Sequence, residues 1–341
     1  MTDKRLVFIP SSGSPDSREA ALRDLLPRLD CPFARGERVG IKLHWGERGN
    51  RRFLSPRYAR AIVGWLREQG VDAFIFDTTV LYSGGRRNST DALQTAALHG
   101  FTESFLRCPV IIADGCDGRD VMDIPAGYRH FETVQVARIF NEASGFFILS
   151  HFKGHLEAGF GGAVKNISMG FASRAQKQRM HSDASPSLIR SRCTRCGTCI
   201  EVCPVQAAQW GVDGYPRYDL TRCIGCCQCI GLCPELALEI LWDTDQTVFQ
   251  EKLVETAAAV WRVIGKKTVL VNALLDICSE CDCMPGEHPI VAPDAGFLGG
   301  YHPVVLDRES LNMVGSSSLD KAHPGIPWER QFSYAEEIGF V

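Results

Sequence analysis

The sequence predicts an α/β fold with a mostly parallel sheet, interrupted by a smaller α+β module that is rich in cysteine. Short runs of β-branched and aromatic residues alternate with amphipathic helical patterns in the first half of the chain. From about residue 185 to 243 this alternation gives way to cysteine-rich sequence, and it then resumes. We therefore expect an α/β domain in two parts, 1–184 and 244–341, with the module at 185–243 inserted between them.

Buried strands are expected where short apolar runs are bounded by turn residues. The expected strands are Leu6–Ile9, Val39–Leu43, Ala73–Phe76, Val110–Ala113, Phe146–Leu149 and, beyond the cysteine-rich segment, Thr268–Val271.

Helices are expected between these strands, which favours parallel pairing because each connection then crosses the sheet. The expected helices are Ser17–Leu26, Pro56–Gln69, Ser89–Leu98, Gln246–Ile264 and Arg308–Val314.

Charge and hydropathy exclude several classes of partner. The 341 residues include 37 basic and 40 acidic ones, without a Lys/Arg block of the kind that binds nucleic acid, so we expect no nucleic-acid partner. The apolar run near the amino terminus is too short for a secretion signal, and later runs fall far below the ~20 residues that span a bilayer. A cytoplasmic protein without membrane contact is expected.

Eight of the 15 cysteines form two runs with identical spacing, C-x-x-C-x-x-C-x-x-x-C-P. The runs are Cys193, Cys196, Cys199 and Cys203, then Cys223, Cys226, Cys229 and Cys233. Three thiolates on one tight loop can hold one face of a [4Fe–4S] cubane while a fourth arrives from elsewhere. Two structural zinc sites are the alternative, although zinc ribbons usually pair separated Cys-x-x-Cys knuckles.

These runs resemble those of bacterial two-cluster ferredoxins, which implies two [4Fe–4S] clusters and transfer of single electrons. In that family the fourth cysteine of each run serves the other cluster. The resemblance therefore implies one cluster on Cys193, Cys196, Cys199 and Cys233, and a second on Cys223, Cys226, Cys229 and Cys203. Cys227 stands where such ferredoxins usually carry glycine, so it could be a spare thiol, an alternative ligand or a small packed residue.

A glycine-rich segment, residues 151–166, directly follows the expected strand Phe146–Leu149. The carboxyl ends of strands are where α/β proteins keep their ligand sites, and glycines let the backbone approach a ligand closely. The candidate binding residues are Lys153, Gly161, Gly162 and Asn166, and the candidate catalytic residues are Lys165, His155 and His181. The alternative is a tight turn with solvated basic side chains.

A third group of cysteines, Cys278, Cys281 and Cys283, follows the strand Thr268–Val271 and could face the same pocket. Together with a nearby histidine, His288, these thiols could hold a further metal or a small-molecule ligand. A redox pair and simple pocket-lining residues are the alternatives, because Cys-x-x-Cys-x-Cys is no strong cluster motif.

With Ile41–Glu47, the glycine-rich segment and the third cysteine group resemble the uncharacterised iron–sulfur family known as domain of unknown function 362. That resemblance implies an α/β domain with an inserted or appended ferredoxin module, and no particular reaction. A fainter similarity links His155, Lys165 and His181 to the nickel-pincer lactate racemase family, where the lysine tethers the cofactor and the histidines are metal ligand and acid/base. That family's upstream catalytic histidine has no counterpart near Gly85–Arg87, so only a shared fold and pocket are expected.

The resulting functional prediction is a ferredoxin-coupled oxidoreductase. A redox partner protein would supply electrons, Lys165 would polarise the accepting small molecule, and His155 or His181 would supply protons. A non-enzymatic electron carrier that docks a partner oxidoreductase is the alternative, and a redox or metal sensor is a third reading. No Gly-x-Gly-x-x-Gly follows the early strands, so no nicotinamide or flavin site is expected.

Overall fold

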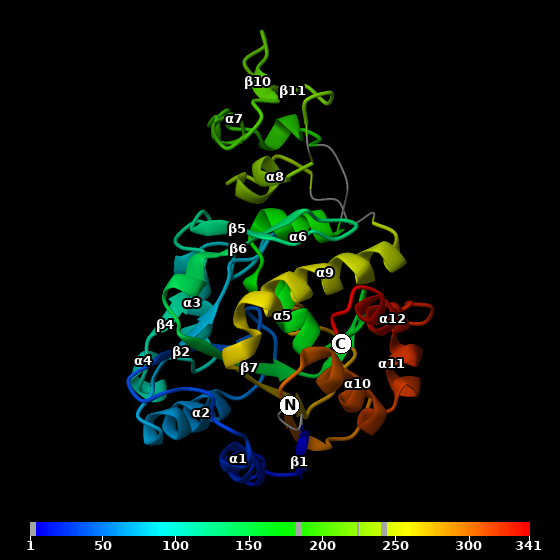
Figure 1. Ribbon diagram of the computed structural model, residues 1–341. Coiled ribbons are helices and arrows are strands. Elements are labelled where there is room, and N and C mark those ends of the chain that lie inside the picture. The colour runs from blue at the N-terminus through cyan, green and yellow to red at the C-terminus, as the bar shows by residue number, and fades with distance from the viewer. Residues whose placement is uncertain (1–4, 182–185, 224, 240–243) are drawn as a thin grey trace.

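The computed structural model describes residues 5–181, 186–223, 225–239 and 244–341 (Figure 1). Within these residues the main sheet has seven strands in the order β1-β13-β12-β7-β2-β3-β4. Their bounds are β1 Val7–Pro10, β13 Gly296–Gly300, β12 Thr268–Leu274, β7 Gly145–His151, β2 Arg38–Lys42, β3 Asp72–Asp77 and β4 Val110–Ile112. All neighbouring strands pair in parallel except at β13, which is antiparallel to β1 and β12. The predicted mostly parallel α/β sheet is confirmed.

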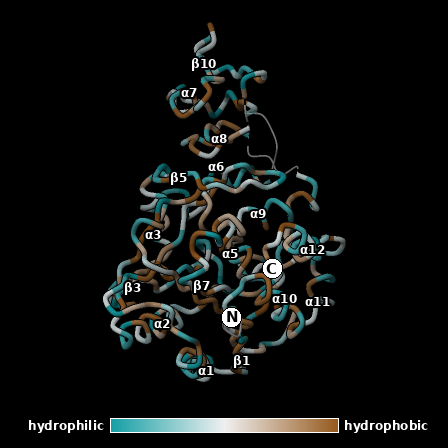
Figure 2. Tube along the Cα trace, viewed as in Figure 1, coloured by the Kyte–Doolittle hydropathy of each residue, from teal (hydrophilic) through white to brown (hydrophobic). Residues whose placement is uncertain are grey.

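Helices cover both faces of the sheet, because alternate residues of each strand point to opposite sides. Phe147 packs in the core under α1 (Pro15–Leu25), α2 (Pro56–Glu68), α3 (Ser89–Leu98) and α4 (Glu103–Leu106). Its neighbours Phe146 and Ile148 pack on the other side with α5 (Ala163–Phe171), α9 (Gln246–Ile264), α10 (Pro303–Val314) and α12 (Glu329–Glu337). Along these helices apolar and polar segments alternate, as Figure 2 shows.

The remaining elements lie outside the main sheet and the helices named above. They are the hairpins β5/β6 (Val121–Pro125, Thr133–Ala137) and β8/β9 (Lys153–His155, Gly159–Gly161), α6 (Arg174–His181), α11 (Ser316–Ala322), and the 3₁₀ turns Leu26–Arg28, Arg138–Asn141, Arg190–Arg192 and Gly265–Lys267. The cysteine-rich segment contains α7 (Thr198–Glu201), the hairpin β10/β11 (Ala208–Trp210, Pro216–Tyr218) and α8 (Gln228–Leu232).

The cysteine-rich segment projects from one end of the main body, next to α6 and the β5/β6 hairpin (Figure 1). The chain enters it after α6 and leaves it before α9, and β7 and β12 on either side of it pair directly in the sheet. The predicted domain boundaries, at 184/185 and 243/244, involve residues outside the described ranges. No helix among the described residues is both long and apolar enough to cross a bilayer.

Each predicted strand and helix corresponds to an observed one within a few residues. The largest difference is α10, which begins at Pro303 rather than at Arg308, since proline is favoured in the first turn of a helix. The sequence analysis missed β13, because its Gly-Phe-Leu-Gly-Gly sequence has weak strand propensity. It also missed α5 and α6, because it assigned no helix between residues 163 and 181.

Candidate functional site

A cavity of about 1320 Å³ opens at the carboxyl ends of β2, β3 and β7 and beside the turn that follows β12. The sequence analysis placed a ligand site at such strand ends. The cavity brings together seven of its candidates outside the cysteine runs, with two of the third cysteine group: Lys153, His155, Gly161, Gly162, Lys165, Asn166, His181, Cys281 and Cys283. Whether these residues act on a ligand stays a prediction.

The close packing of strand β8 explains why residue 154, between Lys153 and His155, is a glycine. A Cβ atom on Gly154 would clash with the carbonyl oxygen of Ser279, and the Gly154 N–H donates to the carbonyl of Cys278 at 2.8 Å. Glycine at this position therefore lets β8 lie directly against the turn after β12. The side chains on either side of it, Lys153 and His155, both reach that turn.

Lys153 anchors the turn through a buried ion pair. Its Nζ lies 2.8 Å from a carboxylate oxygen of Asp282, and the other oxygen lies 3.0 Å from Nδ1 of His151. Burial disfavours the charged ammonium, but Asp282 and Cys281 outweigh this and raise the pKa of Lys153 above its usual value. Burial likewise opposes ionisation of Asp282, yet His151 and Lys153 hold the pKa of that carboxyl below its usual value. The turn is thus fixed on a buried charged network.

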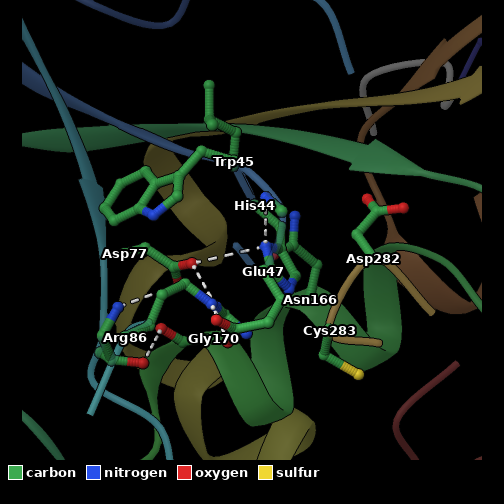
Figure 3. A network of polar contacts seen from close by, with 12 residues as sticks. His44, Trp45, Glu47, Asp77, Arg86, Asn166, Gly170, Asp282 and Cys283 are labelled. Atoms are coloured by element: carbon green, nitrogen blue, oxygen red, sulfur yellow. Dashed lines mark hydrogen bonds and ion pairs between the residues drawn. The ribbon is translucent and has the colours of Figure 1, made fainter. Parts of the chain in front are cut away.

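A second charged network crosses the ends of β2 and β3 (Figure 3). Asp77 accepts from Lys42 at 2.9 Å and lies 3.4 Å from Arg86, which also pairs with Glu47 at 3.2 Å. Nδ1 of His44 lies 3.8 Å from Asp77. Burial lowers the pKa of Lys42, and burial with the nearby Arg86 keeps the pKa of His44 well below its usual range.

Lys42 also ties this network to α5, because its Nζ donates to Oδ1 of Asn166 at 2.9 Å. The Asn166 amide in turn donates to the carbonyl of Leu149 on β7 at 3.0 Å. Asn166 therefore joins two strand ends across the floor of the cavity.

The sequence analysis missed this second network. Its residues stand in Lys42–Glu47 and at Asp77 and Arg86, and the signal was one charged residue at the carboxyl end of each of two apolar strands, Lys42 and Asp77. Lys177 of α6 was missed as well. It donates to three oxygens and has a pKa that burial lowers to about 8.

Cys281, Cys283 and His155 form a compact group at one side of the cavity. One sulfur or ring-nitrogen atom from each lies within 4.8 Å of the others, so a metal ion could fit between them. A hydrogen bond from Cys283 is the largest cause that keeps the pKa of Cys281 well below its usual value, with Lys165 and His155 acting in the same direction. The same bond and burial raise the pKa of Cys283.

Other members of the predicted third metal group lie elsewhere. Cys278 is buried, does not line the cavity, and donates to the carbonyl of Glu280 at 3.2 Å. His288 bonds the carbonyl of Met284 and also lies outside the cavity lining. His155 takes the place that the sequence analysis gave to a downstream histidine.

His181 and Gly162 both line the cavity, and they have different structural roles. His181 lies 3.1 Å from a carboxylate oxygen of Glu157, at the end of α6. Gly162 precedes α5, and a Cβ there would clash with the carboxylate of Asp307, which accepts the N–H groups of Ala163 and Val164 at 2.7 and 2.8 Å. Gly162 thus makes room for the side chain that caps α5.

The eight cysteines of the two runs surround two small cavities. One is lined by Cys193, Cys196, Cys199 and Cys233, and the other by Cys203, Cys223, Cys226 and Cys229 together with Cys227. This is the grouping that the ferredoxin resemblance implies. The donor set is purely thiol, which suits soft metal centres. The cysteine-rich segment could therefore bind metal clusters, and the assignment of each cysteine as a ligand stays a prediction.

The two runs also repeat their backbone conformation. Positive φ angles occur at Arg195 and Gly225, at Gly197 and Cys227, and at Gln206 and Leu236, which are equivalent positions of the two runs. The sulfurs of Cys203 and Cys233 accept N–H bonds from Ala207 and Ala237 at 3.1 and 3.2 Å. Backbone N–H groups aimed at sulfur are the kind of interaction that tunes iron–sulfur centres.

Comparison with known proteins gives one family and several distant structures, two of which are described below. The family model described as Domain of unknown function (DUF362) matches residues 39–312. No protein with a curated description matches significantly.

Among solved structures, a Northeast Structural Genomics Consortium protein from Thermotoga maritima is similar at 10% identity and a TM-score of 0.49, covering 93% of this chain and 60% of that one. The lactate racemase apoprotein from Thermoanaerobacterium thermosaccharolyticum is similar at 14% identity and a TM-score of 0.37, covering 75% and 49%. The chain therefore spans less than two thirds of either structure, and neither likeness carries a functional argument.

Proposed function

This chain belongs to the family described as domain of unknown function DUF362, and from that premise we propose that it is an iron–sulfur oxidoreductase. Eight cysteines, in the grouping given above, would hold two [4Fe–4S] clusters. The large cavity would hold the small molecule that is reduced. When bound, such clusters supply electrons one at a time.

The observation that carries this proposal is the position of α6 between the cysteine-rich segment and the cavity. On one side α8 packs directly on α6, where a Cβ on Gly231 would lie 2.8 Å from the backbone nitrogen of Ala175. On the other side Lys177 and His181, from the same helix, line the cavity. One helix thus separates eight thiols from a pocket of charged residues.

Arg87 makes a second connection between the same two parts. Its guanidinium donates to the carbonyl of Cys233 at 2.6 Å and also to the carbonyl of Leu81. Leu81 lines the cavity, and Cys233 lines one of the two small thiol cavities. These contacts support a functional link, because a purely appended electron carrier would not need its cysteines placed beside the pocket.

Within the cavity the side chains offer cations and proton donors. Lys165 is placed to stabilise negative charge that develops on an accepting group. His181, paired with Glu157, is placed to exchange protons with a bound molecule.

The test is anaerobic purification followed by iron, sulfide and zinc analysis and EPR of the dithionite-reduced protein. We expect about eight iron atoms per chain and two interacting S = 1/2 centres. Zinc without sulfide would contradict the proposal. A stable complex with a partner oxidoreductase, with no small molecule in the cavity, would support the non-enzymatic carrier instead.

A further inference from the structure

Cys281 and Cys283 face the cavity from one tight turn. The N–H of Met284 donates to the carbonyl of Cys281 at 2.9 Å, which closes the turn over these four residues. Asp282, between the two thiols, is held at its carboxylate by Lys153 and at its carbonyl by the N–H of Glu47 at 2.8 Å. The two sulfurs are therefore held close together on a fixed piece of backbone.

Hydrogen-bond donors surround the sulfur of Cys281. Nζ of Lys165 lies 3.5 Å from it and the backbone N–H of Cys283 lies 3.4 Å from it. A ring nitrogen of His155 lies within 4.8 Å of the same sulfur. Donors around a buried sulfur favour a thiolate, the reactive form of cysteine.

The hydrogen bonds of His155 favour this thiol role over a metal site. Its Nδ1 accepts the backbone N–H groups of Glu157 and Ala158 at 3.2 and 3.0 Å, so Nδ1 carries no proton. The neutral ring then carries its proton on Nε2, the nitrogen left to donate to Cys281. A nitrogen that carries a proton has no lone pair for a metal, and losing that proton would leave an imidazolate.

We infer that Cys281 and Cys283 are a redox-active dithiol whose substrate is a small-molecule disulfide bound in the large cavity. The Cys281 thiolate attacks one sulfur of the substrate, forming a mixed disulfide and releasing the first thiolate. Cys283 then loses its proton and attacks the Cys281 sulfur, which forms the Cys281–Cys283 disulfide and releases the second thiolate. The substrate gains two electrons, the two protein thiols lose them, and two protons complete the two product thiols.

The exchange half of this cycle needs only the chain's own thiols and the disulfide. The return of the Cys281–Cys283 disulfide to the dithiol takes two electrons and two protons, and this half rests on the proposed function, which supplies the electrons. A dithiol that stores two electrons suits a site supplied with one electron at a time.

The experiment uses the anaerobic, iron-loaded protein and 2-hydroxyethyl disulfide as the probe, with peptide mass spectrometry as the readout. In the wild-type chain we expect the Cys281–Cys283 peptide to lose two hydrogens. In Cys283→Ser we expect Cys281 to retain one hydroxyethylthio group, because no second thiol releases it. Cys116→Ser, which removes an exposed cysteine outside the site, should react like the wild type.

Two results would overturn the inference. One is a Cys281 that reacts no faster than Cys116 in the wild-type chain. The other is a metal ion, found by elemental analysis, whose removal by a chelator is needed before Cys281 reacts. Both results are obtained on the wild-type chain, so they do not depend on whether a variant folds.

Failure of the proposed function is distinguishable from failure of the dithiol inference. Normal exchange at Cys281 in a chain with zinc instead of iron and sulfide would sink the iron–sulfur proposal and leave the dithiol. Normal iron content and EPR signals with an unreactive Cys281 would contradict the dithiol inference and leave the iron–sulfur proposal standing.

Discussion

Nζ of Lys165 lies 3.5 Å from Sγ of Cys281, a contact that joins the first turn of α5 to the turn after β12. The carboxylate of Asp307 caps the start of α5 and so fixes the direction in which Lys165 points. The contact therefore favours a thiolate at Cys281.

Lys165→Met should shift the pH profile of Cys281 alkylation by iodoacetamide upward by about one unit, because losing a cation at this distance raises a thiol pKa by about one unit. Labelling rates by peptide mass spectrometry give the measurement. Lys266→Met, at an exposed lysine, is the control and should label at the wild-type rate. Equal pH profiles in Lys165→Met and wild type would show that the ammonium does not act on the sulfur.

His155→Gln should make the protein less sensitive to acid. Burial, followed by the nearby Lys165, lowers the pKa of His155 to about 4, whereas an unfolded histidine has its usual value of 6.5. Between these values the unfolded chain binds a proton that the folded chain does not, so stability falls as the pH falls. Cys281 and Glu157 also face the ring and partly oppose this effect.

Between pH 7.5 and 5.5 the wild type should lose ~1 kcal/mol more stability than His155→Gln. The measurement is the anaerobic melting temperature at both pH values, with His288→Gln as the control outside the cavity. A variant that loses as much stability as the wild type would mean that His155 is protonated in the folded state at pH 5.5.

Gly154→Ala should destabilise the protein by about 2 kcal/mol or more, because the added methyl group meets the carbonyl oxygen of Ser279 and pushes β8 off the turn. Gly64→Ala is the matched control, since Gly64 lies within α2 and its Cβ would meet no atom within 4 Å. That change should stabilise the protein by about 0.5–1 kcal/mol through helix propensity. Thermal unfolding of both variants decides the matter, and equal effects would rule out the close approach at Ser279.

The sequence predicted the fold well where local pattern and burial agree. α9 was predicted at its observed bounds, because an amphipathic run of this length needs no tertiary information. β13 was missed because its strand conformation comes from pairing with β1 and β12. The glycines of β13 allow close packing: a Cβ on Gly299 would clash with the side chain of Leu29. Local strand propensity does not report such packing.

The candidate site was predicted in part for a related reason. Ligand sites of α/β proteins lie at the carboxyl ends of strands, so Lys153, His155 and Lys165 were predicted as site residues from their position after β7. The pairing of Asp77 with Lys42 was not found, because it depends on which strands lie side by side. Sequence spacing likewise could not select His155 over His288 as the neighbour of the third cysteine group.

Cys227→Gly should leave the iron content unchanged. Cys227 has φ 56°, a left-handed conformation in which glycine is favoured, and Gly197 stands at the equivalent position of the first run. Its sulfur donates to the carbonyl of Gly225 at 3.4 Å, an interaction that a cluster ligand would not make. Iron analysis of the variant, beside Cys226→Ala as a variant expected to lose iron, tests this. Lower iron in Cys227→Gly would make Cys227 a ligand.

Alanine at Cys193 and at Cys233 should damage the same metal centre, although the two residues belong to different runs. Both line one small cavity, whereas Cys203 and Cys223 line the other. If each cavity holds one cluster, the double variant Cys193→Ala/Cys233→Ala should retain about four iron atoms and one EPR signal, like either single variant. The pair Cys193→Ala/Cys223→Ala should lose both signals. If each run instead served its own centre, Cys193→Ala/Cys233→Ala would lose both signals, and the crossed arrangement would be wrong.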